Sequence, residues 1–251
     1  MANIIRLGSL YLNDCPAEIG LAYKPGKTIS IGETAPGKEI HWVVVNDMLI
    51  ADRCILTEVS WDDLNAQNLV FGKEVTISGF RFTARLIQVG AEEGAPNEWD
   101  SALDAVGEDN SLWHWEDMFF WGQEAATGTA SSRARRGYYS ARYDTYNSSS
   151  SRTVLVGFRP ALVPLASDTL WPSSKAMWWL SEKVMWDDAH LDEKLMLWGG
   201  QNIIFGRLEE LTDYEVILSD RGGAMSNDFG SRLGNGRIVI DRAAISGIQR
   251  I

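Results

Sequence analysis

Few residues of this chain have the types and spacing that catalysis or metal binding requires. The two cysteines, Cys15 and Cys54, form no Cys-x-x-Cys pair and stand beside no histidine. Reactive thiolates and zinc sites depend on such neighbours, so we interpret both as reduced, partly buried thiols. The three histidines, His41, His114 and His190, are widely separated and show no metal-ligand spacing. No Ser-His-Asp order can be assembled from them either.

Two further groups of residues resemble ligand sites only superficially. A cluster of carboxylates lies before the C-terminal region, at Asp187, Asp188, Asp192 and Glu193. Its spacing does not match a calcium loop, so a solvated linker is the favoured interpretation. The glycines of 222–223 and 234–236 lack the Lys and Ser/Thr of a phosphate loop. We therefore expect no enzyme, no metal and no cofactor.

The most distinctive side chains are Tyr, Ser, Asn and Arg between residues 133 and 152. Four of the seven tyrosines of the chain fall between Tyr138 and Tyr146. Tyr offers rigid amphipathic contact area, while Ser and Asn adapt their hydrogen bonds, as in antibody-combining sites. This composition predicts a ligand-binding surface; the alternative is a flexible Ser-rich loop beside a strand whose tyrosines are half buried. The candidate binding residues are Arg133, Arg135, Tyr138, Tyr139, Ser140, Arg142, Tyr143, Asp144, Tyr146, Asn147, Ser149 and Arg152.

Short elements must position this surface. The segment Gly137–Tyr143 is predicted to be a strand between two loops, a small polar one at Ala125–Ser132 and a second one at Asp144–Ser151. A final buried strand is predicted at Thr153–Leu162, with Pro160 at a sheet edge or a strand end, because proline donates no hydrogen bond to a ladder.

Upstream, alternating apolar and polar residues predict short strands up to about residue 90. His41–Val45 is rich in β-forming residues, and Asn46-Asp47 is typical of a turn. Helices are predicted at Ser60–Asn68, with Ser60 as N-cap, and at Asn97–Ala105.

Three motifs in order carry a resemblance to a known family: Leu112–Trp115 with its Trp-x-Trp pair, Arg133–Ser140, and Val156–Leu162 with Gly-Phe-Arg. Their order resembles the formylglycine-generating-enzyme branch of the C-type lectin fold, over roughly residues 40 to 165. The resemblance implies an α+β domain whose strands hold displayed loops. The scaffold residues that it implies are Trp113, Trp115, Gly157, Phe158 and Arg159.

Each scaffold residue has a physical role in this interpretation. One ring of the Trp113–Trp115 pair would pack inward, and Gly157 would let backbone approach closely. The planar guanidinium of Arg159 would donate hydrogen bonds to neighbouring carbonyls or to a carboxylate. The alternative is that these are simply Trp and Arg residues of a β-rich core.

Catalysis by this family does not carry over. The enzyme branch needs a cysteine pair near the end of the domain, and none occurs between Leu112 and Leu165. A related iron-dependent branch needs clustered histidines, which are also absent from the sequence. An enzyme that uses another catalytic group is therefore the third hypothesis.

The segment Arg133–Leu162 resembles, in addition, the variable region of proteins diversified by retroelements. There, Tyr, Ser, Asn, Asp and Arg vary at the surface before an unvaried strand. The resemblance implies a display protein of phage or prophage origin that binds a protein or surface receptor. The second hypothesis is a structural virion or assembly protein in which the same loops make fixed subunit contacts.

The C-terminal segment, 194–251, contains five short predicted strands and is expected to form a small barrel. It resembles Sm-like folds at the following residues: Gly200, Gly206, Leu208, Asp213, Leu218 and Ile240–Ile245. It departs from them at Ile217 and at Arg242-Ala243, the positions whose residues indicate RNA binding in Sm-like proteins. We therefore expect this barrel to attach the protein to other virion subunits or to copies of itself.

A length of 251 residues is enough for a medium domain and a small one. We expect a lectin-like domain at 1–165, a Trp-rich linker or helix at 166–193, and a Sm-like barrel at 194–251. A formal net charge of -11, from 34 acidic and 23 basic residues, makes nucleic acid and anionic lipid improbable partners. The sequence shows neither a signal peptide nor an apolar run of about 18 residues, so a virion or cytoplasmic location without membrane insertion is expected.

Overall fold

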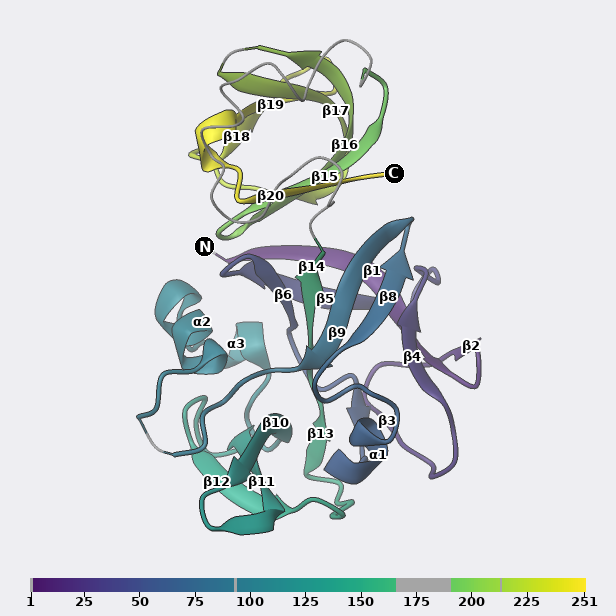
Figure 1. Ribbon diagram of the computed structural model, residues 1–251, viewed down its shortest axis with the longest axis vertical. Coiled ribbons are helices and arrows are strands. Elements are labelled where there is room, and N and C mark those ends of the chain that lie inside the picture. Colours follow the sequence, from purple (N-terminus) through teal and green to yellow (C-terminus); the bar gives the residue numbers. More distant parts are fainter. Residues whose placement is uncertain (1, 93, 166–190, 213) are drawn as a thin grey trace. The chain divides into compact units, whose positions relative to one another are not determined.

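The computed structural model describes residues 2–92, 94–165, 191–212 and 214–251. This part of the chain is mostly β-sheet, with 51% strand and 9% helix, so helices are only a minor part of the architecture. Two compact units are formed (Figure 1). The first comprises Arg6–Val43 and Leu49–Val163, and the second comprises Pro164–Ile251 together with Ala2–Ile5 and Val44–Met48.

Most of the expected Trp-rich linker, 166–193, lies outside the described residues. The same holds for His190, Asp187, Asp188 and Asp213, so the predictions that rest on them stay predictions.

One sheet of eight strands has the order β2-β1-β5-β6-β14-β9-β8, with β4 paired to β1. Its strands are β1 (Asn3–Leu12), β2 (Cys15–Pro16), β4 (Ile29–Gly32), β5 (Glu39–Val45), β6 (Met48–Ala51), β8 (Lys73–Ile77), β9 (Phe80–Leu86) and β14 (Pro160–Pro164). The predicted Asn46-Asp47 turn joins β5 to β6. Both turn residues have positive φ, 50° and 61°, which suits a two-residue hairpin.

A second sheet of six strands carries the predicted binding segment and has the order β12-β11-β10-β13-β7-β3. Its strands are β3 (Leu21–Ala22), β7 (Leu56–Thr57), β10 (Phe119–Ala126), β11 (Thr129–Gly137), β12 (Asp144–Ser148) and β13 (Val156–Phe158). Strand β12 lies at the edge of this sheet.

The strands and loops predicted around the binding segment are placed wrongly along the sequence. Ala125–Ser132, expected as a loop, forms the tip of the β10–β11 hairpin. Of Gly137–Tyr143, expected as a strand, only Gly137 belongs to β11, and residues 138–143 are the connection between β11 and β12. Five of the eight residues of the second expected loop, Asp144–Ser148, form strand β12. The small polar residues 129–132 join a strand because their backbone pairs with both neighbours, as in Ser132↔Ser148, and side-chain periodicity does not report this pairing.

The predicted strand Thr153–Leu162 is two strands in two different sheets. Phe158 of β13 pairs with Leu56 in the second sheet, whereas Ala161 of β14 pairs with Ile50 in the first sheet. Arg159 lies at the crossing between them. Pro160 begins β14, as predicted, where a missing N–H is tolerated.

Three short helices complete the first unit: α1 (Trp61–Asn65), α2 (Glu98–Val106) and α3 (Asn110–Trp113). The predicted N-cap Ser60 accepts a hydrogen bond from the Asp63 backbone N–H, and the Asp63 carboxylate accepts one from the Ser60 N–H. Asn97 caps α2 by accepting a hydrogen bond from the Asp100 backbone N–H. The sequence pattern did not predict α3.

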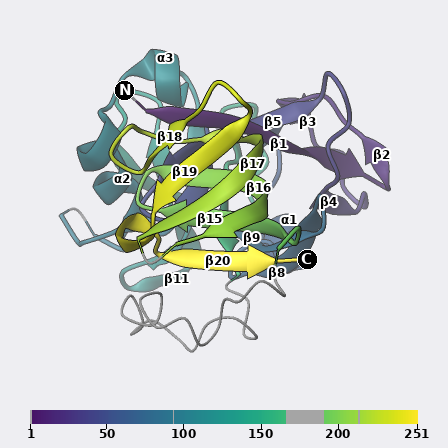
Figure 2. The same cartoon turned by 90° about the horizontal axis from the view of Figure 1, so that it is seen from above.

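The second unit is a curled antiparallel sheet with the order β18-β19-β17-β16-β15-β20 (Figures 1 and 2). Its elements are β15 (Lys194–Gly199), β16 (Asn202–Leu211), β17 (Glu215–Ala224), β18 (Gly230–Arg232), β19 (Arg237–Asp241), the 3-10 helix η4 (Arg242–Ala244) and β20 (Gly247–Arg250). The short strand β18 was not predicted. Apolar side chains from these strands, including Leu197, Ile204, Leu218 and Ile240, form one buried core inside the curl.

Candidate ligand-binding surface

Strands β11 and β12 place the predicted binding residues on two opposite faces of their sheet. Arg133 pairs with Asn147, whereas Tyr146 pairs with Ala134 one position along. Directly paired residues share a face, and successive residues alternate between faces. The first face therefore carries Arg133, Arg135 and Asn147, and the second face carries Asp144 and Tyr146. The sequence pattern did not separate these two groups.

Four rings pack against one another at the end of β11, and we call Phe119, Tyr138, Tyr139 and Tyr143 the aromatic cluster. Tyr138 stacks on Phe119 with ring centroids 4.9 Å apart. Tyr139 meets Tyr138 edge-on at 4.7 Å and Tyr143 edge-on at 5.0 Å. Tyr139 is 70% exposed, and Tyr143 is exposed as well. The rings are thus held by mutual contacts while two of them face solvent.

The backbone turns sharply where the cluster begins. Gly137 has φ of +101°, and a Cβ there would lie 2.5 Å from the Met118 carbonyl oxygen. Tyr138 also has positive φ, 78°, which is strained for a bulky side chain. Its N–H donates to the Trp115 carbonyl at 2.8 Å, and its carbonyl accepts from the Asp117 N–H at 3.1 Å. These bonds stabilise the turn that lifts the tyrosines off the strand.

Arg142 and Arg152 are engaged by carboxylates of the chain itself. Arg142 donates from Nε to Glu108 and from Nη2 to Asp104, each at 2.7 Å. Arg152 donates through both arms of its fork to Asp63, at 2.7 and 2.8 Å. Such two-pronged pairs fix geometry. They therefore fasten the middle of the segment to α2 and its end at Arg152 to α1 rather than present positive charge.

The Arg152–Asp63 pair makes a testable contribution at acidic pH. Burial alone would raise the pKa of Asp63, but hydrogen bonds from Arg152 and Ser60 outweigh it and lower the pKa. A lowered pKa in the folded state contributes stability above the unfolded-state value, about 4, and loses it as pH falls through the folded value. In urea unfolding between about pH 5 and pH 2, Arg152→Ala should reduce the slope of stability against pH. An unchanged slope would contradict this assignment.

Arg133 and Arg135 lie over aromatic rings on the first face. The Arg133 guanidinium is 4.1 Å from the Trp61 ring centroid, and Arg133 also donates to the Ala130 carbonyl at 2.6 Å. The Arg135 guanidinium is 3.9 Å from the Phe119 ring centroid. Arg135 thus joins the aromatic cluster from the strand side.

The second face is hollowed next to Tyr146. The Tyr146 hydroxyl donates to the Ala91 carbonyl at 2.6 Å. A recess of about 450 Å³ is lined there by Ala91, Glu92, Ala126, Thr127, Thr129, Ser132, Asp144 and Tyr146. This recess is a separate place from the aromatic cluster, so Tyr146 and Asp144 would serve a different contact.

The remaining predicted binding residues are polar and lie near the edge strand. Ser140 is exposed in the turn after Tyr139. Asn147 donates to the Ser151 hydroxyl at 3.1 Å, and the Ser149 hydroxyl donates to Asp62 at 3.1 Å. These two bonds order the loop that follows β12.

The scaffold residues lie beneath this surface. Trp113, Phe158 and Arg159 are fully buried, whereas Trp115 is half-buried. The Arg159 Nη2 donates to the Trp113 carbonyl at 2.6 Å and to the His114 carbonyl at 3.3 Å. A Cβ on Gly157 would lie 2.5 Å from the Leu56 carbonyl oxygen.

No protein-family model, curated protein or solved structure matches this chain. In the part of the chain that the structure describes, no helix is long and apolar enough to cross a membrane.

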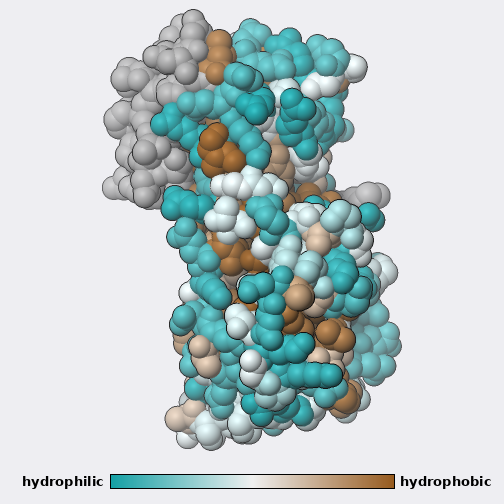
Figure 3. Space-filling view, turned by 90° about the vertical axis from the view of Figure 1, so that its right-hand side faces the viewer, coloured by the Kyte–Doolittle hydropathy of each residue, from teal (hydrophilic) through white to brown (hydrophobic). Residues whose placement is uncertain are grey.

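Large apolar side chains reach the surface in several places, among them Phe71, Val154 and Leu155. On the face of the first unit drawn in Figure 3, apolar patches likewise alternate with hydrophilic side chains.

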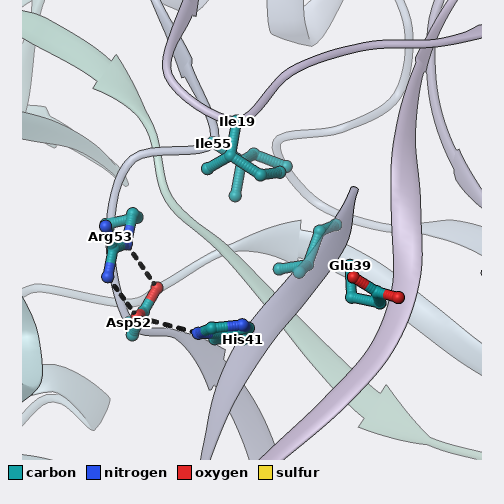
Figure 4. A pocket seen from close by; sticks show the side chains of 7 residues that line it. Ile19, Glu39, His41, Asp52, Arg53 and Ile55 are labelled. Atoms are coloured by element: carbon teal, nitrogen blue, oxygen red, sulfur yellow. Dashed lines mark hydrogen bonds and ion pairs between the residues drawn. The ribbon is translucent and has the colours of Figure 1, made fainter. Parts of the chain in front are cut away.

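A cluster of ionisable groups around Asp52 was not predicted from sequence spacing (Figure 4). The buried Asp52 Oδ2 lies 3.8 Å from His41 Nδ1 and 3.9 Å from His114 Nδ1. Arg53 donates to the same carboxylate at 2.9 Å and lies 2.9 Å from His114 Nε2. Two histidines distant in sequence thus meet because the first residues of β5 and the C-terminal end of α3 lie near one carboxylate. A pocket of about 180 Å³ opens there, lined by Ile19, Glu39, Ile40, His41, Asp52, Arg53 and Ile55.

The cysteine next to this pocket is not an activated nucleophile. Cys54, two residues from Asp52, is buried, and burial raises the pKa of its thiol to about 11. It is therefore a neutral thiol at physiological pH and a poor nucleophile. Cys15 is exposed and also unpaired with another cysteine. Among the described residues, no three side chains of the metal-ligating types are grouped closely enough to hold an ion.

Proposed function

We propose that this chain is a non-enzymatic display protein that binds a protein or surface receptor through the aromatic cluster. One observation carries the proposal: Tyr139 and Tyr143 face solvent while Tyr138 and Phe119 hold them in place. Tyrosines that pack on each other lose little conformational entropy on binding, which favours affinity. The buried scaffold at Trp113 and Arg159 keeps the underlying sheet rigid.

The finer parts of the proposal concern fold and origin. The first unit is proposed to be a C-type-lectin-like domain, and the second a Sm-like barrel that attaches the protein to virion subunits or to itself. The curled antiparallel sheet of the second unit supports this view of the barrel. The binding segment lies between the scaffold motifs, which supports a phage or prophage protein whose loops are diversified by a retroelement.

The double variant Tyr139→Ala/Tyr143→Ala tests the binding surface. We expect labelled full-length protein to bind at least one surface in a panel of intact bacterial cells, and the variant to bind about tenfold less, because exposed aromatic anchors dominate interfaces. Its free energy of unfolding should stay within about 1 kcal/mol of the parent, since both rings are exposed. Tyr214→Ala, at an 81% exposed tyrosine of the second unit, is the matched control and should bind normally.

Two results would count against the surface. If the double variant fails to fold, the rings belong to the core rather than to a binding site. If it folds and binds as well as the parent, the ligand contacts another part of the molecule, and fixed subunit contacts become the better explanation for these loops.

Diversification makes a separate prediction at the level of DNA. We expect a near-copy of the codons for 133–162 close to the gene, differing from it at adenines, together with a reverse-transcriptase gene. Sequencing the flanking DNA measures this directly. Flanking DNA without such a repeat would remove the retroelement from the proposal and leave the binding surface intact.

A further inference from the structure

Arg135 is a cation without an internal counter-ion. Within the described ranges its side chain makes no hydrogen bond or ion pair, and its Nε is buried without a partner. The nearby Arg142 and Arg152 both pair with carboxylates. In a chain with net charge -11, carboxylates are abundant, so an arginine left unpaired beside an aromatic surface needs an explanation.

The setting of Arg135 fixes the orientation of its guanidinium. The group stacks on the Phe119 ring at 3.9 Å, and stacking leaves the N–H groups at its edge free to donate. Thr145 lies directly opposite Arg135 on β12, on the same face, and adds a hydroxyl. Partial burial lowers the pKa of Arg135, with Tyr143 acting in the opposite direction. The free protein thus holds a partly desolvated cation, which is unfavourable until an anion joins it.

We propose that Arg135 receives an Asp or Glu side chain of a protein ligand, while Tyr139 and Tyr143 pack against the apolar neighbours of that acidic residue. The inference rests on the proposed binding function and gives the chemistry of its ligand. A carboxylate matches the fork of a guanidinium in shape and charge. The exposed tyrosine faces and the exposed Leu155, whose carbonyl accepts from the Phe119 N–H, supply the apolar contact.

The overall negative charge makes this preference specific. At low ionic strength the chain repels acidic proteins in general, so an acidic ligand is retained only where its carboxylate reaches an unpaired cation. The contact should therefore depend on one arginine and weaken with added salt.

A random peptide library, selected on immobilised full-length protein, tests the inference. Peptides selected by the parent should be enriched in Asp or Glu next to an aromatic or aliphatic residue. Arg135→Met keeps the apolar stem over Phe119 and removes the charge. It should abolish that enrichment and weaken the best acidic peptide about tenfold or more, whereas Arg135→Lys should retain part of the affinity. For the parent, affinity should fall with salt, and for Arg135→Met it should not.

The outcomes separate this inference from the function on which it rests. Peptides that need Tyr139 and Tyr143 but show no acidic enrichment, or bind Arg135→Met equally well, would overturn the role of Arg135 and keep the binding surface. Peptides that bind the Tyr139→Ala/Tyr143→Ala variant unchanged, or a parent that selects none, would contradict the proposed function itself. Arg207→Met, at an exposed arginine of the second unit, is the control for loss of one charge.

Discussion

Arg159→Ala is expected to lower the free energy of unfolding by about 3–5 kcal/mol. The side chain is fully buried, and its Nη2 donates to the carbonyls of Trp113 and His114. Its guanidinium also lies 4.7 Å from the Phe120 ring centroid and 5.2 Å from that of Trp99. Alanine would leave both carbonyls without this donor and open a cavity between the rings. Urea unfolding followed by near-ultraviolet circular dichroism measures the loss.

Two further variants make this result interpretable. Arg159→Met fills most of the volume without the donors, so the difference between Met and Ala reports the cavity alone. Arg142→Ala removes an arginine that is partly exposed and pairs with three carboxylates, those of Asp100, Asp104 and Glu108, and it should cost less than about 1 kcal/mol. An Arg159→Ala protein as stable as the Arg142→Ala protein would show that the buried guanidinium is not a structural tie.

Gly157→Ala is expected to cost about 3 kcal/mol through a single added methyl group. The new Cβ would lie 2.5 Å from the Leu56 carbonyl oxygen and 2.8 Å from the Cys54 Cβ. The Leu56 backbone cannot move away easily, because Leu56 is paired with Phe158 in the ladder between β7 and β13. The same denaturation experiment measures the effect.

Gly32→Ala is the matched control for this substitution. Gly32 also lies in a strand of the first unit, but the nearest atom to its added Cβ is a Tyr11 ring carbon at 3.5 Å, an ordinary contact. It should change stability by less than about 1 kcal/mol. Equal losses at the two glycines would indicate that the effect at Gly157 comes from strand propensity rather than from the close approach of backbone.

Local signals in the sequence were sufficient where local chemistry decides the structure. Ser60 and Asn97 cap helices because their side chains reach the backbone three residues ahead. The Asn46-Asp47 turn follows from residues that tolerate positive φ. The strands of the second unit follow from short apolar runs between glycine-containing turns, although β18 was too short to be recognised.

The binding segment was placed wrongly because its structure depends on distant partners. Residues 129–132 carry no apolar alternation, yet hydrogen bonds to β10 and β12 make them part of a strand. No propensity predicts positive φ at Tyr138, since the bonds that stabilise it come from Trp115 and Asp117. The meeting of His41 and His114 at Asp52 likewise depends on the packing of segments more than sixty residues apart. The exposure of Tyr139 and Tyr143 required the structure as well.

The direct passage from β13 to β14 has a consequence for how the first unit fluctuates. Residues 156–158 lie inside one sheet between β10 and β7, and directly after Arg159 residues 160–164 lie inside the other sheet between β6 and β9. Neither sheet can release this segment without disturbing the other, so opening there should require cooperative unfolding of both. Strand β12, at a sheet edge, has no such constraint and can exchange its amide hydrogens by local fraying. Motion next to the ligand contacts is thereby uncoupled from loss of the native fold.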